Sequence, residues 1–154
     1  MAGWKHFREI AAWQHARTLK LQVDQFLERP QIKCKYKQCD QLSDSARSGP
    51  SNIAEGFGKF GNKEFARYVR ISKGSELEVW NHLIDLHDQK LISQDELIRA
   101  EQNCKKAVGA ATGLIRHLES TPDPPRPRKE PKKPQEPKEP EEPEEPNEPK
   151  EPKN

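Results

Sequence analysis

The sequence predicts an all-α fold, namely an antiparallel, up-and-down four-helix bundle followed by a disordered, proline-rich C-terminal tail. Three observations support this prediction. Apolar residues recur at helical spacing in four segments, the connections between these segments are short, and no segment alternates like a strand. The prolines are also unevenly placed, because only two of the 14 precede residue 122. We therefore expect a helical domain over residues 1–121 and a tail over residues 122–154.

The first predicted helix covers about residues 6–28. Its apolar residues are spaced four, three, four and three apart, which places them on one face. They are Ala12, Ala16, Leu19, Val23 and Phe26. Arg29-Pro30 is expected to end this helix, because the residue before a proline is disfavoured in the α region. Residues 31–37 then read as a basic connector.

The second and third predicted helices cover residues 38–57 and 63–88. Gly49-Pro50 lies inside the second and predicts a kink or a short break there. Gly56 and Gly58 are expected to end it, because glycine tolerates the left-handed conformation. Asn62 is the predicted N-cap of the third helix.

The fourth predicted helix begins at a capping box. Ser93 and Glu96 have the spacing at which each side chain satisfies a free backbone N–H of the other. Two heptad series follow and indicate a closely packed seam. Their members are Leu97, Cys104, Ala111 and Leu118, with Ala100, Ala107 and Leu114 between them.

Charge and cysteine content limit the classes of function. Residues 1–121 hold 19 basic and 15 acidic residues, a net charge of +4, and residues 122–154 hold 8 and 10, a net charge of −2. The cysteines at positions 34, 39 and 104 form no CxxC pair, so reduced thiols are expected and no metal site is indicated. No apolar run is long enough for a membrane span, and we expect a cytoplasmic protein.

Five cations form the main candidate site, at spacings of four, four, three and three. They are Lys59, Lys63, Arg67, Arg70 and Lys73. At 100° per residue, the middle three lie within about 60° of one helix face, and no acidic residue interrupts the series. The stripe could neutralise the phosphates of RNA or DNA. An ordinary solvated helix face is an equally good interpretation.

No set of residues indicates an enzyme. The five histidines lack metal-ligand spacing, GFGKFGNK lacks the phosphate-loop pattern, and no cofactor is indicated. From Pro131 to Pro152 every third residue is proline, the repeat of a polyproline II rod. An alternative function is therefore an oligomeric scaffold in which this tail is a spacer or a docking arm for a protein partner.

Three blocks resemble a known family. Ile10-x-x-Trp13-x-x-Ala16 resembles its "L-x-x-W-x-x-A" opening, and residues 50–56 resemble its proline followed by "x-N-I-A-E-G". Lys63-Glu64-Phe65 with Gly74-Ser75 and Glu78 resembles its "K-E-F … G-S-x-x-E" block. Over about residues 6–120, the chain resembles the four-helix bundle proteins encoded by intervening sequences of bacterial 23S ribosomal RNA genes.

The resemblance implies an antiparallel four-helix bundle that assembles into a homopentamer, with no known enzymatic activity. A similar bundle, the accessory variability determinant of diversity-generating retroelements, binds nucleic acid and a reverse transcriptase, and such partners carry over only by analogy. The usual arginine pair upstream of the motif is replaced by Ser43 and Asp44. Asn52, Glu55 and Gly56 are interpreted as structural residues whose polar groups hydrogen-bond across the turn or between helices.

Overall fold

A computed structural model describes residues 3–33, 35–59 and 61–123 of the chain. Within these residues all regular structure is helical and no strand is present, which confirms the all-α prediction for this part. The elements are a 3-10 turn η1 (Phe7–Glu9) and the α-helices α1 (Ala11–Leu27), α2 (Pro30–Lys33), α3 (Tyr36–Phe57), α4 (Asn62–Asp88) and α5 (Gln94–Ser120). The predicted tail from residue 124 onward lies outside the described residues, as does Cys34.

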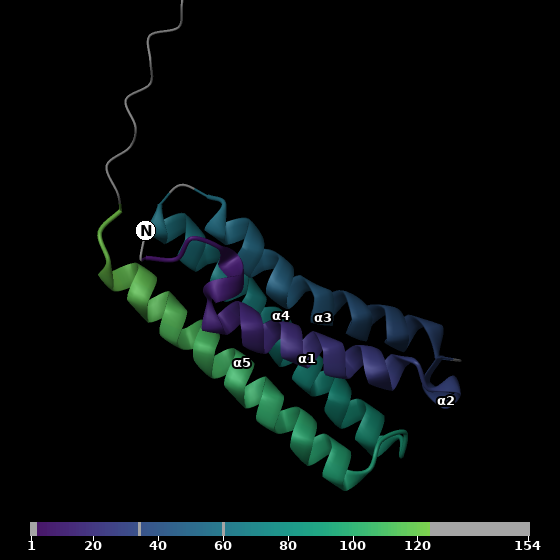
Figure 1. Cartoon of the computed structure of the whole chain (residues 1–154). Coiled ribbons are helices and arrows are strands. Elements are labelled where there is room, and N and C mark those ends of the chain that lie inside the picture. The colour runs from purple at the N-terminus through teal and green to yellow at the C-terminus, as the bar shows by residue number, and fades with distance from the viewer. Residues whose placement is uncertain (1–2, 34, 60, 124–154) are drawn as a thin grey trace, which may run out of the picture.

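Four of the five α-helices are long, and Figure 1 shows them lying alongside one another with the short α2 at one end. α1 packs against α3 and α5, and α4 packs against the same two helices. None of the described helices combines the length and apolar composition that a membrane crossing needs.

Two apolar clusters fill the interior. The predicted faces of the first and fourth helices supply much of both, because all five residues of the predicted α1 face and all seven of the predicted α5 seam are buried. The cluster around α2 and the α4–α5 turn includes Val23, Leu42 and Leu83. The cluster around the α3–α4 turn includes Ile53, Phe65 and Val69.

A short polar layer separates these clusters along α4. Ser72, Ser75 and Glu76 are all buried, and they lie between Val69 of one cluster and Val79 of the other. The buried surface of α4 is therefore apolar at both ends and polar in the middle.

The start and end of the first helix differ in how well the sequence predicted them. α1 ends at Leu27, in line with the expected effect of Arg29-Pro30. Its start at Ala11 is later than expected, because residues 7–9 form the separate turn η1. The expected connector also contains a helix, α2, with Pro30 at its first position, where a missing N–H costs no helical hydrogen bond.

The predicted short break at Pro50 does not occur. α3 is continuous from Tyr36 to Phe57, with Pro50 inside it. A proline ring inside a helix crowds the backbone carbonyl four positions earlier, which here belongs to Ala46. The continuous helix therefore lacks the hydrogen bond that a backbone N–H at position 50 would donate to the carbonyl of Ala46.

Gly61, rather than Asn62, is the N-cap of α4, which corrects the prediction. Gly61 has φ of 103°, the left-handed region in which glycine carries no steric penalty. Asn62 is instead buried as the first helical residue, and its side-chain amide donates to the carbonyls of Thr121 and Pro122 at 3.1 and 3.0 Å. Asp123 caps the helix, because its carboxylate accepts from the backbone N–H of Asn62.

Candidate nucleic-acid interface

The predicted cation stripe runs from the turn before α4 into the first half of that helix. Lys63, Arg67 and Arg70 are exposed, and the two arginine side chains are 67% and 52% exposed. Lys59, in the turn before α4, and Lys73, on the next helical turn, are half-buried. The structure therefore presents the middle three cations to solvent and the outer two less completely.

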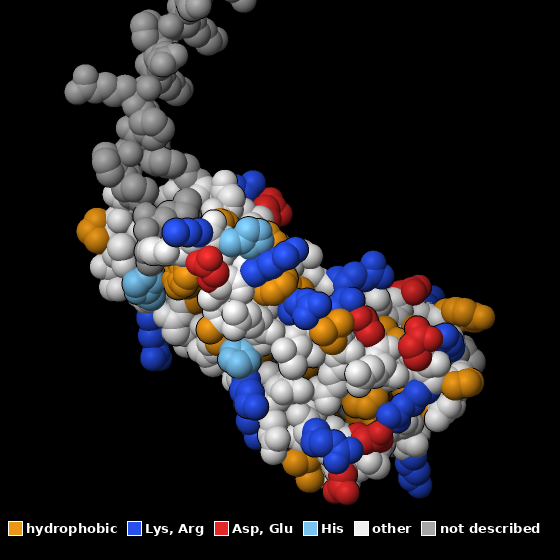
Figure 2. Space-filling model, in the orientation of Figure 1, with side chains coloured by type: hydrophobic (Ala, Val, Ile, Leu, Met, Phe, Trp, Pro, Cys, Tyr) orange, Lys and Arg blue, Asp and Glu red, His pale blue; other side chains and the backbone are white. Residues whose placement is uncertain are grey.

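Carboxylates neutralise more of the stripe than the sequence indicates. Lys59 pairs with Glu55 at 3.1 Å, Arg67 pairs with Glu64 at 3.3 Å, and Arg70 pairs with Glu119. Figure 2 shows the same mixture more widely, since Asp and Glu side chains are interspersed among the Lys and Arg side chains of the visible face. No acidic residue interrupts the series in sequence, but three of its five cations are ion-paired with neighbouring carboxylates in the structure.

These ion pairs are weak because they are solvated. Exposed pairs stabilise a protein by about 0–1 kcal/mol, so a phosphate can replace the carboxylate at small cost. Glu55 is exposed, and its pKa is lowered first by the hydrogen bond from Lys59 and then by that from Tyr68. The carboxylates reduce the positive potential of the stripe but do not block access to it.

A hollow of about 340 Å³ lies beside the stripe and is lined by Lys63, Ala66, Arg70 and Glu119. No acidic residue of the described chain lies within ion-pair distance of the Lys63 ammonium group. The backbone N–H of Lys63 donates to Asp123 at 3.3 Å. The backbone N–H groups of the first turn of α4 thus bind the Asp123 carboxylate, and the Lys63 side chain remains available to an anion.

Asn52, from the predicted structural motif, takes part in hydrogen bonds between α3 and α4. The Asn52 amide donates to the carbonyl and hydroxyl oxygens of Ser48 at 2.9 and 3.0 Å, and Ser75 of α4 donates to the same Ser48 hydroxyl at 2.8 Å. Asn52 therefore reaches the next helix through one serine.

Gly56 lies within α3 rather than in a left-handed cap. A Cβ atom at Gly56 would lie 2.6 Å from the Phe65 ring and 2.7 Å from the Tyr68 Cβ. Gly58 is the C-cap and has a right-handed φ of −77°, so the expected left-handed ending is wrong. Glycine is needed at position 56 because α4 passes too close for any side chain.

Glu76 is a buried carboxyl that sequence reasoning did not identify. It is 2% exposed, its Oε1 accepts from the Ser72 hydroxyl at 3.1 Å, and its Oε2 has no hydrogen-bond partner in the described residues. Burial raises the pKa of Glu76 to about 7, against smaller opposing effects of Ser72 and Lys73. Only helical spacing could have indicated its burial, because Val69, Ser72, Glu76 and Val79 follow one another at three- and four-residue steps on one face of α4.

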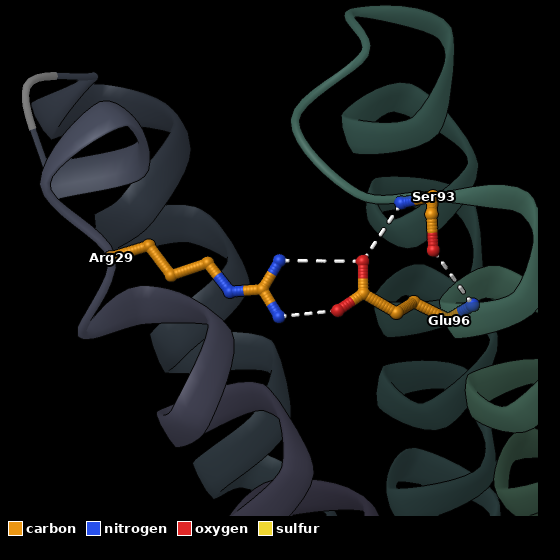
Figure 3. Close-up of polar contacts among 3 residues, drawn as sticks. All are labelled: Arg29, Ser93 and Glu96. Atoms are coloured by element: carbon orange, nitrogen blue, oxygen red, sulfur yellow. Dashed lines mark hydrogen bonds and ion pairs between the residues drawn. The ribbon is translucent and has the colours of Figure 1, made fainter.

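A charged cluster joins the chain after α1 to the start of α5 (Figure 3). The Arg29 guanidinium faces the Glu96 carboxylate with both terminal nitrogens, at 2.5 and 3.4 Å. Glu96 also accepts from the Ser93 backbone at 2.8 Å, and its own N–H donates to the Ser93 hydroxyl, which confirms the capping box. Arg29 and Ser93 lower the pKa of Glu96 to about 2.

In the part of the chain that the structure describes, no three His, Cys, Asp or Glu residues are grouped as metal ligands would be. No curated protein matches the chain. A family model described as 23S rRNA-intervening sequence protein matches residues 8–112, which includes all three sequence blocks and most of the four long helices. The chain therefore belongs to the 23S rRNA-intervening sequence protein family.

Proposed function

We propose that this protein is a non-enzymatic, oligomeric helix bundle that associates with RNA or DNA through the basic face of α4. The observation that carries the proposal is the common exposed face of Lys63, Arg67 and Arg70. Lys59 and Lys73 extend that face at either end. Phosphates bound there would release condensed counterions, which is the main source of sequence-independent affinity for nucleic acid.

We propose an antiparallel, up-and-down arrangement of the four long helices. Two contacts support it. Arg29, just after α1, meets Glu96 in the first turn of α5, and Asn62 at the start of α4 meets Thr121 just after α5. Contacts between the end of one helix and the start of another are those expected of antiparallel neighbours.

Exposed apolar side chains support the oligomeric part of the proposal. Ile71, Leu77 and Ile84 of α4 and Ile98 of α5 are 39–46% exposed. Leu77 and Ile84 lie within about 20° of each other around α4, whereas Ile71 lies on another flank. A contiguous patch of such side chains is typical of a surface that another copy covers. The family resemblance implies a pentamer, which would repeat the α4 stripe in every subunit.

Charge reversal tests the nucleic-acid part. Lys63→Glu, Arg67→Glu and Arg70→Glu together are expected to abolish retention of a labelled 20-nucleotide RNA or DNA in a filter-binding assay. The matched control reverses Lys20, Lys33 and Lys90, which changes the net charge equally at other positions. Circular dichroism checks that both variants remain helical. Equal retention by wild type and the α4 variant would overturn the proposal.

Size-exclusion chromatography with light scattering tests the assembly. We expect an oligomer, and if it copurifies with nucleic acid, the 260/280 nm absorbance ratio falls after nuclease and high-salt treatment. A monomer under all conditions would contradict the oligomeric part.

A scaffold function is the second candidate, and one observation favours it. Asn62 binds the carbonyls of residues 121 and 122, so the chain just before the proline-rich sequence is held at the start of α4. Deletion of residues 124–154 keeps the Asp123 cap and is expected to remove partner pull-down while sparing assembly. If the same partners are recovered after the deletion, the tail is only a spacer.

A further inference from the structure

The outer face of α5 carries a second band of cations. Arg99, Lys106 and Arg116 are all exposed. At 100° per residue, all three fall within an arc of about 100°, and at 1.5 Å per residue the band is about 26 Å long. The same arc of the helix includes Asp95 but no other acidic residue.

This band differs from the α4 stripe in its electrostatics. None of its three cations forms an ion pair with any described residue, whereas three of the five α4 cations do. Other acids of α5 are already engaged with α4, because Glu101 accepts from the Trp80 indole and Glu119 pairs with Arg70. The positive charges of the outer band are therefore not neutralised by ion pairs within the described chain, whereas those of the α4 stripe are partly neutralised.

Two exposed glycines, Gly109 and Gly113, lie inside this arc, between Lys106 and Arg116 in the sequence. A Cβ atom added to either glycine would meet nothing within 4 Å, so packing inside this chain does not require glycine there. A glycine inside a helix destabilises the helix relative to an alanine at the same position. What glycine does allow is the close approach of another backbone or a ligand to the helix.

We propose that the outer face of α5 is a second nucleic-acid contact surface. Arg99, Lys106 and Arg116 bind backbone phosphates, and Gly109 and Gly113 let the strand lie against the helix. The inference rests on the proposed nucleic-acid function and assigns that function a further surface.

The test measures binding of the full chain to fluorescein-labelled 20-nucleotide single-stranded RNA and duplex DNA over a salt series. Arg99→Gln, Lys106→Gln and Arg116→Gln together are expected to weaken binding about tenfold or more at low salt. Removing three phosphate contacts is also expected to reduce the slope of log affinity against log salt by roughly 2–3. The matched variant carries Lys63→Gln, Arg67→Gln and Arg70→Gln.

A second pair of variants separates binding from folding. Gly109→Gln with Gly113→Gln is expected to leave the melting temperature unchanged or raise it, because the added side chains extend into open space. The same variant is expected to weaken binding several-fold. Gly74→Gln on α4 is the control, because a Cβ there also meets nothing within 4 Å.

The outcomes are distinguishable. Loss of affinity in both α5 variants, with native helicity and mass, supports the inference, and the preferred probe identifies RNA or DNA. Loss only in the α4 variant overturns it and leaves the proposed function standing. No binding of either probe by wild type at low salt overturns both. A change of oligomeric mass without a change in binding per subunit would instead make this face a contact between copies, and would also overturn the inference.

Discussion

The two ends of the helix bundle are joined by different interactions. At one end, the chain after α1 meets the start of α5 through Arg29 and Glu96, whose side chains are 32% and 23% exposed. At the other end, the α3–α4 turn relies on the absence of a side chain at Gly56 and on the buried amide of Asn62. The first end depends on charge in partial contact with water, and the second depends on shape and buried hydrogen bonds. We therefore expect the second end to be more sensitive to substitution and less sensitive to acid.

Glu76 lies between the two ends and has the largest expected effect on pH dependence. Its pKa is about 7 in the folded chain against 4.5 for an unperturbed glutamate, so the folded state binds the proton more tightly than the unfolded state. The stabilisation is complete below pH 4.5 and is lost as the pH rises through 7. At 1.36 kcal/mol per pKa unit, the free energy of unfolding is expected to fall by roughly 3 kcal/mol over this interval.

Chemical denaturation from pH 4.5 to 8 measures this effect. Glu76→Gln is expected to flatten the profile, and it supplies the background in which the two ends can be compared. An unchanged slope in Glu76→Gln would assign the pH dependence to other groups.

Gly56→Ala is expected to give the largest effect of any substitution at the two ends, a loss of about 2–3 kcal/mol in the free energy of unfolding. The new methyl group would overlap the Phe65 ring and the Tyr68 Cβ, and neither is the free end of a flexible side chain. Urea denaturation measures the loss. Gly58→Ala is the matched control and is expected to be near neutral, because its nearest contact is 3.4 Å away and its φ is right-handed. Equal effects of the two substitutions would contradict close packing at Gly56.

Asn62→Ala is expected to cost about 1–2 kcal/mol, because two hydrogen bonds to the carbonyls of residues 121 and 122 are lost. The loss should be nearly the same at pH 5 and pH 7, since an amide does not titrate. Thermal unfolding at both pH values checks this. Asn81→Ala, on the exposed side of α4, serves as a control with an expected change within about 0.5 kcal/mol.

Glu96→Gln is expected to give the smallest effect, about 1 kcal/mol at pH 7, because partial solvation weakens the ion pair. Glutamine keeps the oxygen that accepts from the Ser93 backbone, so the substitution removes the ion pair and retains the capping box. The lowered pKa of Glu96 means that its stabilisation is present above pH 4.5 and is lost as the pH falls to about 2. Wild type and variant should therefore converge in acid, and a constant difference down to pH 2 would contradict the ion pair.

The sequence predicted what depends on local periodicity. The buried faces of α1 and α5 and the capping box at Ser93 follow from spacing within one helix, and all three are confirmed. Of the kink or short break predicted at Pro50, the break does not occur, since α3 is continuous through the proline. Spacing within one helix therefore predicted these buried faces and this cap correctly, whereas the presence of Pro50 did not predict where a helix ends.

Contacts between distant segments could not be predicted in the same way. Asp123 caps α4 from 61 residues away, and Glu119 reaches Arg70 across 49 residues. The middle of the candidate stripe was correctly placed on one helix, but its partial neutralisation by Glu119 required knowledge of which helix lies beside α4. Its role in nucleic-acid binding stays a prediction.

The N-terminal segment and the end of α5 lie close together, although they are far apart in the chain. The order of the helices along the chain could therefore be changed without changing which helices pack together. The rings of Trp4 and His117 lie 5.8 Å apart in an edge-on contact, so the segment before α1 reaches the last turns of α5. A short linker between these segments could close the polypeptide into a ring, and new termini could be opened in the α4–α5 turn, where Lys90 has φ of 60°. In such a circular permutant α5 would precede α1, and every helix could still meet the same neighbours.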